Sequence, residues 1–118
     1  LHDALPICCG GDRDRSKRPM MGAISGELAD YTVITSDNPR SEEPGAIIKD
    51  VEAGIRSTTG RYKCITDRRK AIEHALLEAQ KGDVIVLAGK GHETYQEFKH
   101  KTIHFDEREV VLELLQKM

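Results

Sequence analysis

The sequence predicts an α/β domain with a mostly parallel sheet, helices on both faces of that sheet, and a small edge hairpin. Two observations lead to this expectation. Short apolar runs alternate along the chain with longer segments whose apolar residues recur at helical spacing, and this alternation is typical of parallel sheets. The run Val84–Ala88 is continuously apolar and rich in β-branched residues, as expected for a strand buried on both faces.

Three segments are predicted as central parallel strands. In chain order they are residues 31–35, residues 62–66, which give the weakest pattern, and residues 84–88. A further strand before Gly10 is compatible with the sequence, but only residues 5–9 are available to form it.

Two helices are expected to begin at prolines, Pro19 and Pro44. Proline suits the first helical position because its missing N–H would have no partner there. The apolar faces at helical spacing are Met20, Met21, Ile24 and Leu28 in the first helix, and Ile47, Ile48, Val51 and Ile55 in the second.

Two further helices are expected to begin at polar caps. Asp67 caps a helix that Gly82 ends with a left-handed residue. Asp106, with Glu109 three residues later, resembles a capping box and begins the last helix. Between these helices, residues 96–99 and 101–105 are predicted as the edge hairpin.

Composition excludes several classes of function. At 118 residues the chain is at most one domain, and its net charge of -2 gives no basic field for nucleic acid. No apolar run approaches membrane-spanning length. The three cysteines are odd in number and lack C-x-x-C spacing, so we expect reduced thiols in a cytoplasmic protein and no metal site.

A glycine-rich, basic loop joins the earliest possible strand to the first helix. It reads Gly10-Gly11-Asp12-Arg13-Asp14-Arg15-Ser16-Lys17-Arg18. Two glycines permit close backbone approach, and a helix N-terminus with four cations can hold a phosphate or a carboxylate. The alternative is a solvated charged loop, in which Asp12 and Asp14 neutralise part of the charge.

The turn Asp37-Asn38-Pro39-Arg40 follows the first predicted strand. In open α/β sheets, the carboxyl end of a strand is where ligands bind. Asp37 offers a partner for an ammonium group, and Arg40 can form a bidentate pair with a carboxylate. The turn therefore has groups for both charges of an amino acid, although Asp-Asn-Pro is also good structural turn chemistry.

The segment Gly89-Lys90-Gly91-His92-Glu93 follows the last predicted strand and belongs to the same sheet edge. It is not a Walker A loop, because the upstream glycine and a Ser or Thr after the lysine are missing. Glu93 can accept a hydrogen bond from an ammonium group, while His92 is either structural or catalytic. Since all three loops follow parallel strands at the same end, we expect them to converge.

Taken together, these segments resemble the C-terminal domain of the Mur ligases. The resemblance is carried by Gly10–Asp14, Lys17–Pro19, Thr35–Glu42 and Ala88–Glu93, and it covers residues 8–118. Within the family, the motifs are most similar to the members that add meso-diaminopimelate. The resemblance implies a Rossmann-like three-layer domain that binds the incoming amino acid.

The resemblance also implies the activity of the whole enzyme. Such a ligase forms an amide between meso-diaminopimelate and UDP-N-acetylmuramoyl-L-alanyl-D-glutamate in peptidoglycan synthesis, converting ATP to ADP. ATP and Mg would be bound mainly by a central domain, and the UDP-linked dipeptide by other domains. We therefore expect no catalytic residue in this chain, no nucleic-acid partner and no membrane contact.

Family motifs assign the binding residues of the amino acid. They are Arg13, Asp37, Asn38, Pro39, Arg40, Gly89 and Glu93. Arg13 and Arg40 would hold carboxylates, Asp37 and Glu93 the distal ammonium group, and Asn38 and the Gly89 backbone would add hydrogen bonds. Lysine-adding relatives typically replace the arginine of the turn, so Arg40 points to meso-diaminopimelate.

The start of the chain departs from the family pattern. Residues 1–7 do not resemble the family's approach to the glycine turn, so we expect a non-family or artefactual head followed by a domain over residues 8–118. Because the family's own first strand and helix are absent, that domain is expected to be incomplete, and the isolated chain inactive.

Two other functions remain compatible with the sequence. One is a non-catalytic α/β module that binds anions or nucleotides through residues 10–18. The other is a protein-interaction domain without a small ligand, which would tolerate the loss of Arg40.

Overall fold

A parallel sheet of four strands forms the centre of the molecule, in the order β3-β2-β1-β4. It is seen in a computed structural model, which describes residues 3–7, 11, 14–90 and 92–118. The strands are β1 (Asp3–Ile7), β2 (Tyr31–Ile34), β3 (Arg61–Cys64) and β4 (Val84–Ile85). β1 pairs with both β2 and β4, with Ala4 opposite Tyr31 and Asp3 opposite Val84.

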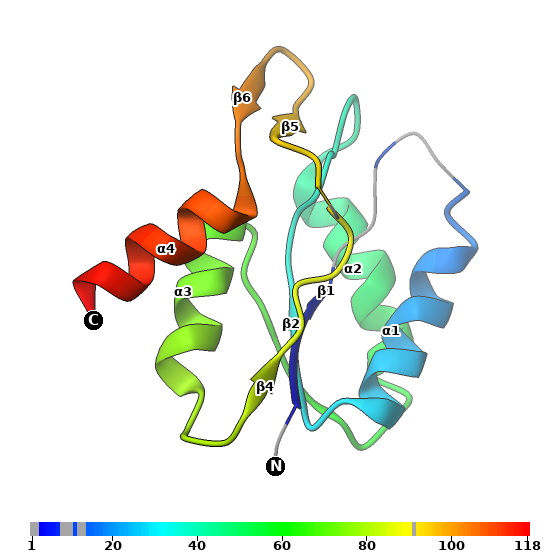
Figure 1. The fold of residues 1–118 in the computed structure, drawn as a ribbon. Helices are drawn as coiled ribbons and strands as arrows, with labels where there is room; N and C mark the ends of the chain where they lie inside the picture. Colours follow the sequence, from blue (N-terminus) through cyan, green and yellow to red (C-terminus); the bar gives the residue numbers. More distant parts are fainter. Residues whose placement is uncertain (1–2, 8–10, 12–13, 91) are drawn as a thin grey trace.

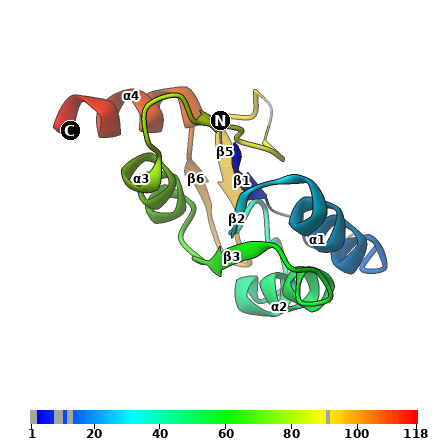
Figure 2. The same cartoon turned by 90° about the horizontal axis from the view of Figure 1, so that it is seen from below.

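Four helices in the described residues lie in two pairs, on opposite sides of this sheet (Figures 1 and 2). The helices α1 (Lys17–Leu28) and α2 (Pro44–Ile55) cover one side. The helices α3 (Arg68–Glu78) and α4 (Glu107–Lys117) cover the other. The expectation of a mixed α/β domain with a parallel sheet is therefore confirmed.

The hairpin differs from its prediction. β5 (Tyr95–Glu97) and β6 (Thr102–His104) pair with each other in a separate two-stranded antiparallel sheet. They do not extend the edge of the main sheet, and Figure 1 shows them beyond the ends of its strands. This placement puts the hairpin over the loops that leave β2 and β4.

The prediction of residues 84–88 as a strand buried on both faces is wrong. Only Val84–Ile85 are in β4, and Val84 and Val86 expose 49% and 46% of their surface. β4 is the last strand in the sheet and pairs with β1 alone, so its outer edge has no strand beside it among the described residues.

The first described residues take part in the sheet. Asp3–Ile7 form β1, which is hydrogen-bonded between β2 and β4. Residues 3–7 are therefore part of the sheet, because a strand with partners on both sides completes its backbone hydrogen bonding. Whether these residues are native to the family stays a prediction.

The apolar core lies in two clusters, one on each side of the sheet. Ile34 of β2 packs against Ile48, Val51 and Ile55 of α2. On the other side, Ile72 of α3 packs with Phe105, Val110 and Leu114 at the end of the hairpin and in α4. The helical spacing of residues 47, 48, 51 and 55 is thus the core face that the sequence predicted.

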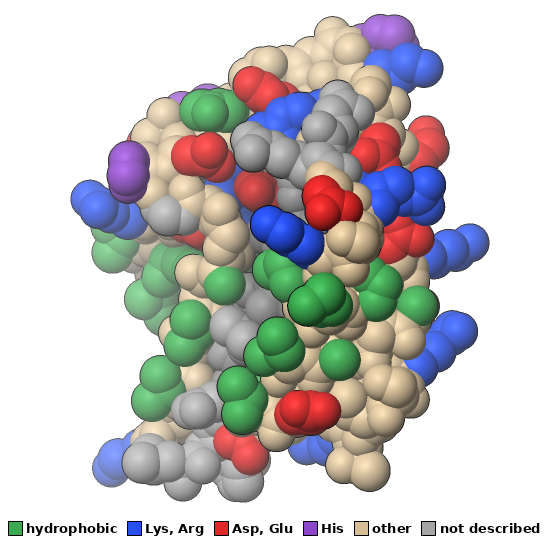
Figure 3. Space-filling model, turned by 90° about the vertical axis from the view of Figure 1, so that its right-hand side faces the viewer, with side chains coloured by type: hydrophobic (Ala, Val, Ile, Leu, Met, Phe, Trp, Pro, Cys, Tyr) green, Lys and Arg blue, Asp and Glu red, His purple; other side chains and the backbone are tan. Residues whose placement is uncertain are grey.

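The apolar face predicted for the first helix is exposed instead. Met20 and Leu28 expose 61% and 77% of their surface, and Figure 3 shows apolar side chains gathered on the side of the molecule where α1 lies. α1 instead buries the small residues Gly22, Ser25 and Gly26. The backbones lie so close there that a Cβ added to Gly22 would be 2.1 Å from the Val51 carbonyl oxygen. A Cβ on Gly54 would lie 1.7 Å from the Pro19 carbonyl oxygen, so close backbone contact joins the two helices.

Helix ends follow the sequence in most cases. Pro44 is the first residue of α2, and the Asp67 carboxylate accepts a hydrogen bond from the Lys70 backbone N–H at 3.0 Å. Asp106 accepts one from the Arg108 backbone N–H at 2.9 Å. Gly82 does have a positive φ of 95°, but it lies in the turn before β4, since α3 already ends at Glu78.

Among the described residues, no helix combines the length and the apolar character that crossing a membrane requires.

Candidate functional site

The loops that follow β1, β2 and β4 meet at the carboxyl ends of these strands. The Gly11 backbone N–H donates to the Asn38 carbonyl at 2.7 Å, and a Cβ on Gly11 would lie 1.7 Å from the Pro39 carbonyl oxygen. Lys90 Nζ lies 3.1 Å from Asp37 Oδ1. The convergence expected from a parallel sheet is therefore present, and only glycine fits at residue 11.

The hairpin strand β5 holds the Asp37–Arg40 turn in place. Gln96 Nε2 donates to the Asp37 carbonyl at 2.6 Å, and the Glu97 backbone N–H donates to Asn38 Oδ1 at 2.9 Å. The Arg40 backbone N–H donates to the Glu97 carbonyl at 3.0 Å. The hairpin thus acts as a rigid support for the turn, a role that sequence patterns did not indicate.

Arg40 has an unusual backbone conformation and a partly engaged guanidinium group. Its φ of 54° lies in the left-handed region, which is uncommon for a residue with a side chain. Nε donates to Glu97 Oε2 at 3.1 Å and Nη1 donates to the Gly11 carbonyl at 2.9 Å. Within the described residues Nη2 makes no hydrogen bond, and 25% of the side chain is exposed. The group is fixed in direction and keeps donors for a ligand.

Lys90 is a buried cation at the centre of the site. Its side chain is fully buried, and its Nζ contacts the Asp37 carboxylate, donates to Asn38 Oδ1 at 3.5 Å and donates to the Tyr95 carbonyl. Glu93 Oε1 lies 3.8 Å from the same Nζ. Lys90 therefore neutralises the Asp37 carboxylate from within the protein. The sequence signal for it, a lysine between two glycines after a strand, was visible, but only its burial reveals the role.

Glu93 is an acidic group of the site that stays partly accessible and makes no direct contact with Arg40. Its side chain is 36% exposed, and Oε1 accepts a hydrogen bond from Asn38 Nδ2 at 3.4 Å. The negative charge of Glu93 raises the pKa of the Tyr95 hydroxyl, which donates to Glu93 Oε2 at 3.5 Å. Gly89, at the start of this loop, has a φ of 110° that a residue with a Cβ rarely adopts.

A second buried cation, Arg68, ties the strand ends together. At the start of α3, it donates from Nη1 to the Ser36 carbonyl and from Nη2 to the Ala88 carbonyl, both at 3.1 Å. Its Nη2 also lies 2.7 Å from Glu107 Oε2 at the start of α4. Arg68 thereby fixes the distance between the ends of β2 and β4, from which the two site loops depart. Sequence reasoning assigned it no role.

The basic loop before α1 is used differently from its prediction. Arg13, expected to hold a carboxylate, lies outside the described residues. Arg18 is buried between α1 and α2, where it donates to Glu42 and Asp50, and these carboxylates raise its pKa. Asp14 accepts hydrogen bonds from the Ser16 hydroxyl and backbone N–H, which lower the pKa of its carboxyl group.

The described residues offer no cluster of metal ligands beside these groups. His92 is exposed at the surface. In residues 3–7, 11, 14–90 and 92–118, no cluster of three or more His, Cys, Asp or Glu side chains is positioned to hold a metal ion. The site presents a guanidinium group, that of Arg40, and a carboxylate, that of Glu93, on one sheet edge, and both are partly exposed.

Comparisons with known proteins identify relatives of this chain. The model of the family "Mur ligase, glutamate ligase domain" matches residues 5–91. A UDP-N-acetylmuramoyl-L-alanyl-D-glutamate–2,6-diaminopimelate ligase from Caldanaerobacter subterraneus subsp. tengcongensis is 60% identical over 111 residues. One with the same activity in its name, from Clostridium acetobutylicum, is 57% identical over 110 residues. These alignments cover 94% and 93% of this chain, which spans only 23% and 22% of the relatives' lengths.

A solved structure of a UDP-N-acetylmuramoyl-L-alanyl-D-glutamate–2,6-diaminopimelate ligase superposes with a TM-score of 0.92 at 41% identity. The superposition covers 98% of this chain and 24% of the other. The family model, the superposition and the sequence similarity agree, and the chain therefore belongs to the Mur ligase family, whose glutamate ligase domain it represents.

Proposed function

We propose that this chain is the amino-acid-binding domain of an ATP-dependent ligase that adds meso-diaminopimelate to UDP-N-acetylmuramoyl-L-alanyl-D-glutamate in peptidoglycan synthesis. The names of the relatives at 57–60% identity support the reaction. The observation that carries the assignment is the Arg40 guanidinium, held by Glu97 and Gly11 with donors to spare, on the same sheet edge as the accessible Glu93 carboxylate.

The proposed ligand contacts follow from which groups are already engaged. Arg40 binds a carboxylate of the amino acid, and Glu93 binds its distal ammonium group. Asp37 was also assigned to that ammonium group, but it is buried against Lys90, so we propose that it acts by holding Lys90 and the turn. Asn38 is likewise occupied by Glu93 and Glu97 and orients both.

The remaining assigned residues shape the pocket or add to it. Pro39 packs against Gly11 and fixes the turn, while Gly89 permits a backbone that brings its own polar groups towards the ligand. Arg13 is proposed as a second carboxylate partner on the family resemblance alone.

ATP and Mg are proposed as cofactors of the whole ligase, held by other domains. The residues of this chain do not fit them: the sequence has no Walker A loop, and the described residues contain no cluster of metal ligands. No step of the reaction is therefore assigned to ATP within this chain. A cytoplasmic location is proposed from the cysteine pattern, which favours a reducing compartment.

The alternative of an anion- or nucleotide-binding module loses two of the four cations on which it relied in residues 10–18. Arg18 is buried in ion pairs with Glu42 and Asp50. Arg15 also pairs with Asp50, at 3.2 Å.

The test is amino-acid selectivity in the full-length gene product. ADP release with meso-diaminopimelate should exceed that with lysine by roughly 10⁴-fold in kcat/KM, because lysine leaves the guanidinium without a carboxylate. Arg40→Ala should reduce kcat/KM for diaminopimelate by about 10²–10³-fold and leave the lysine reaction nearly unchanged. Arg15→Ala, which removes an exposed arginine outside the site, serves as the matched control.

Two results would contradict this function. One is equal use of lysine and diaminopimelate by the unaltered enzyme. The other is an unchanged selectivity ratio in Arg40→Ala, which would mean that the guanidinium only supports the turn. Arg40→Gly separates the two roles further, since glycine relieves the left-handed backbone while removing the side chain.

A further inference from the structure

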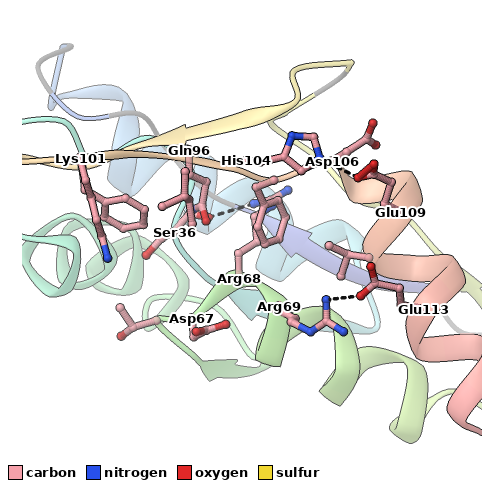
Figure 4. A pocket seen from close by; sticks show the side chains of 15 residues that line it. Ser36, Asp67, Arg68, Arg69, Gln96, Lys101, His104, Asp106, Glu109 and Glu113 are labelled. Atoms are coloured by element: carbon pink, nitrogen blue, oxygen red, sulfur yellow. Dashed lines mark hydrogen bonds and ion pairs between the residues drawn. The ribbon is translucent and has the colours of Figure 1, made fainter.

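The strand β5 presents its side chains alternately to two sides of the hairpin. Gln96 lines a hollow between the start of α3, the hairpin and α4, and Figure 4 shows its side chain among those around this hollow. Tyr95 and Glu97, its neighbours in β5, point to the opposite side, because successive residues of a strand alternate. There Tyr95 contacts Glu93 and Glu97 contacts Arg40, the two groups proposed to bind the amino acid.

Glu97 is joined to the Asp37–Arg40 turn both by its backbone and by its side chain. Its N–H donates to Asn38 Oδ1 at 2.9 Å, and its carbonyl accepts from the Arg40 N–H at 3.0 Å. Its carboxylate accepts from Arg40 Nε at 3.1 Å. The two backbone contacts do not depend on which side chain stands at residue 97, so the turn is held without the carboxylate.

The carboxylate of Glu97 acts on the guanidinium group of Arg40 instead. This group ends a long side chain with several rotatable bonds, and 25% of the side chain is exposed, so packing alone does not fix its direction. Nε donates to Glu97, and Nη1 donates to the Gly11 carbonyl at 2.9 Å. Because the guanidinium group is planar and rigid, holding it at two nitrogens fixes both its plane and its direction.

These two hydrogen bonds decide how a carboxylate can approach Arg40. The Nε–H that a side-on pair requires is already donated to Glu97. Within the described residues, Nη2 keeps its N–H groups and Nη1 keeps the one not donated to Gly11. A ligand carboxylate is therefore directed to the end of the guanidinium group, at Nη1 and Nη2. A donor that is already ordered also loses less conformational entropy when the ligand binds.

Glu97 also places a negative charge close to the carboxylate of the ligand, which opposes binding. The side chain of Glu97 is 40% exposed, so water screens this repulsion. The hydrogen bond to Nε is direct and charge-assisted, and it acts on the orientation of Arg40 whether or not the ligand is present. We therefore expect the fixing of Arg40 to outweigh the repulsion.

We propose that Glu97 is a positioning residue for amino-acid recognition, which acts through Arg40 and directs its guanidinium group towards a carboxylate of the ligand. This inference rests on the proposed function, in which that ligand is meso-diaminopimelate. It adds to the site a side chain of the hairpin that lies outside the three converging loops, and it makes selectivity against lysine depend on that side chain.

The test is steady-state ADP release by the full-length gene product with meso-diaminopimelate and with lysine. Glu97→Ala should raise KM for diaminopimelate by about three- to tenfold and keep kcat within about twofold, because ordering Arg40 then falls to the binding step. The lysine reaction should change by less than about twofold, so the selectivity ratio should fall. Glu113→Ala is the matched control, since it removes an exposed glutamate from its pair with Arg69, outside the site, and it should change neither KM.

Further variants separate positioning from charge and from stability. Glu97→Gln removes the charge but keeps an oxygen that accepts from Nε, so its KM should stay within about twofold of that of the unaltered enzyme. Arg40→Ala combined with Glu97→Ala should be no worse than Arg40→Ala alone, because Glu97 acts only through Arg40. In urea unfolding, Glu97→Ala should match Glu113→Ala, since each removes one partner of a solvent-accessible ion pair.

The proposal is overturned by an unchanged or lower KM in Glu97→Ala, or by a loss in Glu97→Gln as large as that in Glu97→Ala. A further loss in the double variant would overturn it too, as would a much lower stability of Glu97→Ala than of Glu113→Ala. Equal use of lysine and diaminopimelate by the unaltered enzyme would overturn the proposed function together with this inference. A preference for diaminopimelate that Arg40→Ala abolishes and Glu97→Ala retains would overturn this inference alone.

Discussion

Replacing Arg68 by methionine should strongly destabilise the domain. Methionine keeps most of the volume of the side chain and removes the guanidinium group. That group is fully buried and joins Glu107 to the Ser36 and Ala88 carbonyls. The substitution therefore leaves a carboxylate and two carbonyls without this partner, in a place that water does not reach.

The expected cost follows from these contacts. Breaking a buried ion pair by removing one partner costs about 3–5 kcal/mol, since the other charge stays buried. Each carbonyl that loses its donor adds about 1 kcal/mol, partly overlapping with the first cost. We expect a loss of roughly 4–6 kcal/mol, a large fraction of the 5–15 kcal/mol that stabilises a typical domain.

The assay is urea unfolding followed by far-ultraviolet circular dichroism. Arg69→Met is the matched control: it removes the neighbouring arginine, whose exposed pair with Glu113 should contribute no more than about 1 kcal/mol. The double variant Arg68→Met with Glu107→Leu should recover at least about 2 kcal/mol, because no unpaired charge remains. A loss below about 1 kcal/mol in Arg68→Met, or a double variant no more stable than the single one, would refute this reasoning.

Three further outcomes are expected. Gly54→Ala should destabilise the domain by roughly 2 kcal/mol or more in urea unfolding, because the added Cβ would lie 1.7 Å from the Pro19 carbonyl oxygen of α1. Gly45→Ala is the control and should cause no such loss, because a Cβ at Gly45 would have open space around it. Equal urea midpoints for the two variants would contradict this prediction. The Glu109 carboxylate raises the pKa of the His104 imidazole, so the pair stabilises the folded protein fully below the ordinary imidazole pKa of 6.5, and this stabilisation is lost as the pH rises through the raised pKa. Glu109→Gln should therefore lower the pKa of His104 measured by NMR titration. An unchanged pKa in this variant would contradict the prediction. Burial raises the pKa of the Cys64 thiol to about 11, so little of the reactive thiolate is present at pH 8. In a variant whose other cysteines are replaced by serine, iodoacetamide at pH 8 should modify the folded chain roughly 100-fold more slowly than the unfolded chain. Similar rates for the two states would contradict the burial of this thiol.

Local rules account for most of the elements that the sequence predicted. The helix beginning at Pro44 and the helices capped by Asp67 and Asp106 start where they were expected, because proline geometry and capping hydrogen bonds involve only neighbouring residues. The spacing of Ile48, Val51 and Ile55 identified a true core face.

Two apolar patterns predicted buried faces that the packing between elements left exposed. The apolar residues of α1 are exposed, since Gly22 and its neighbours allow α1 to approach α2 by its small face instead. Val84 and Val86 of the run at residues 84–88 are exposed because β4 has a partner strand on one side only. Neither outcome can be read from a residue and its neighbours in sequence.

The sequence predicted which loops meet at the candidate site but not which of their charged side chains pair with one another. Parallel strands bring their carboxyl ends together, so the loops around Gly11, Asp37–Arg40 and Gly89 were expected to meet, and they do. The sequence did not show that Lys90 forms an ion pair with Asp37, because whether a lysine is buried depends on elements far away along the chain.

By itself, the sequence determined the class of fold, the starts of α2, α3 and α4, and the meeting of the loops at one sheet edge, because these depend on local geometry and on the order of strands. Only the tertiary structure decided which charges remain for a ligand. Lys90 and Arg68 are committed to partners inside the protein, while Arg40 and Glu93 keep accessible groups. The physical reason is that pairing and burial are set by long-range contacts, and a buried charge is stable only where such contacts complete its hydrogen bonds.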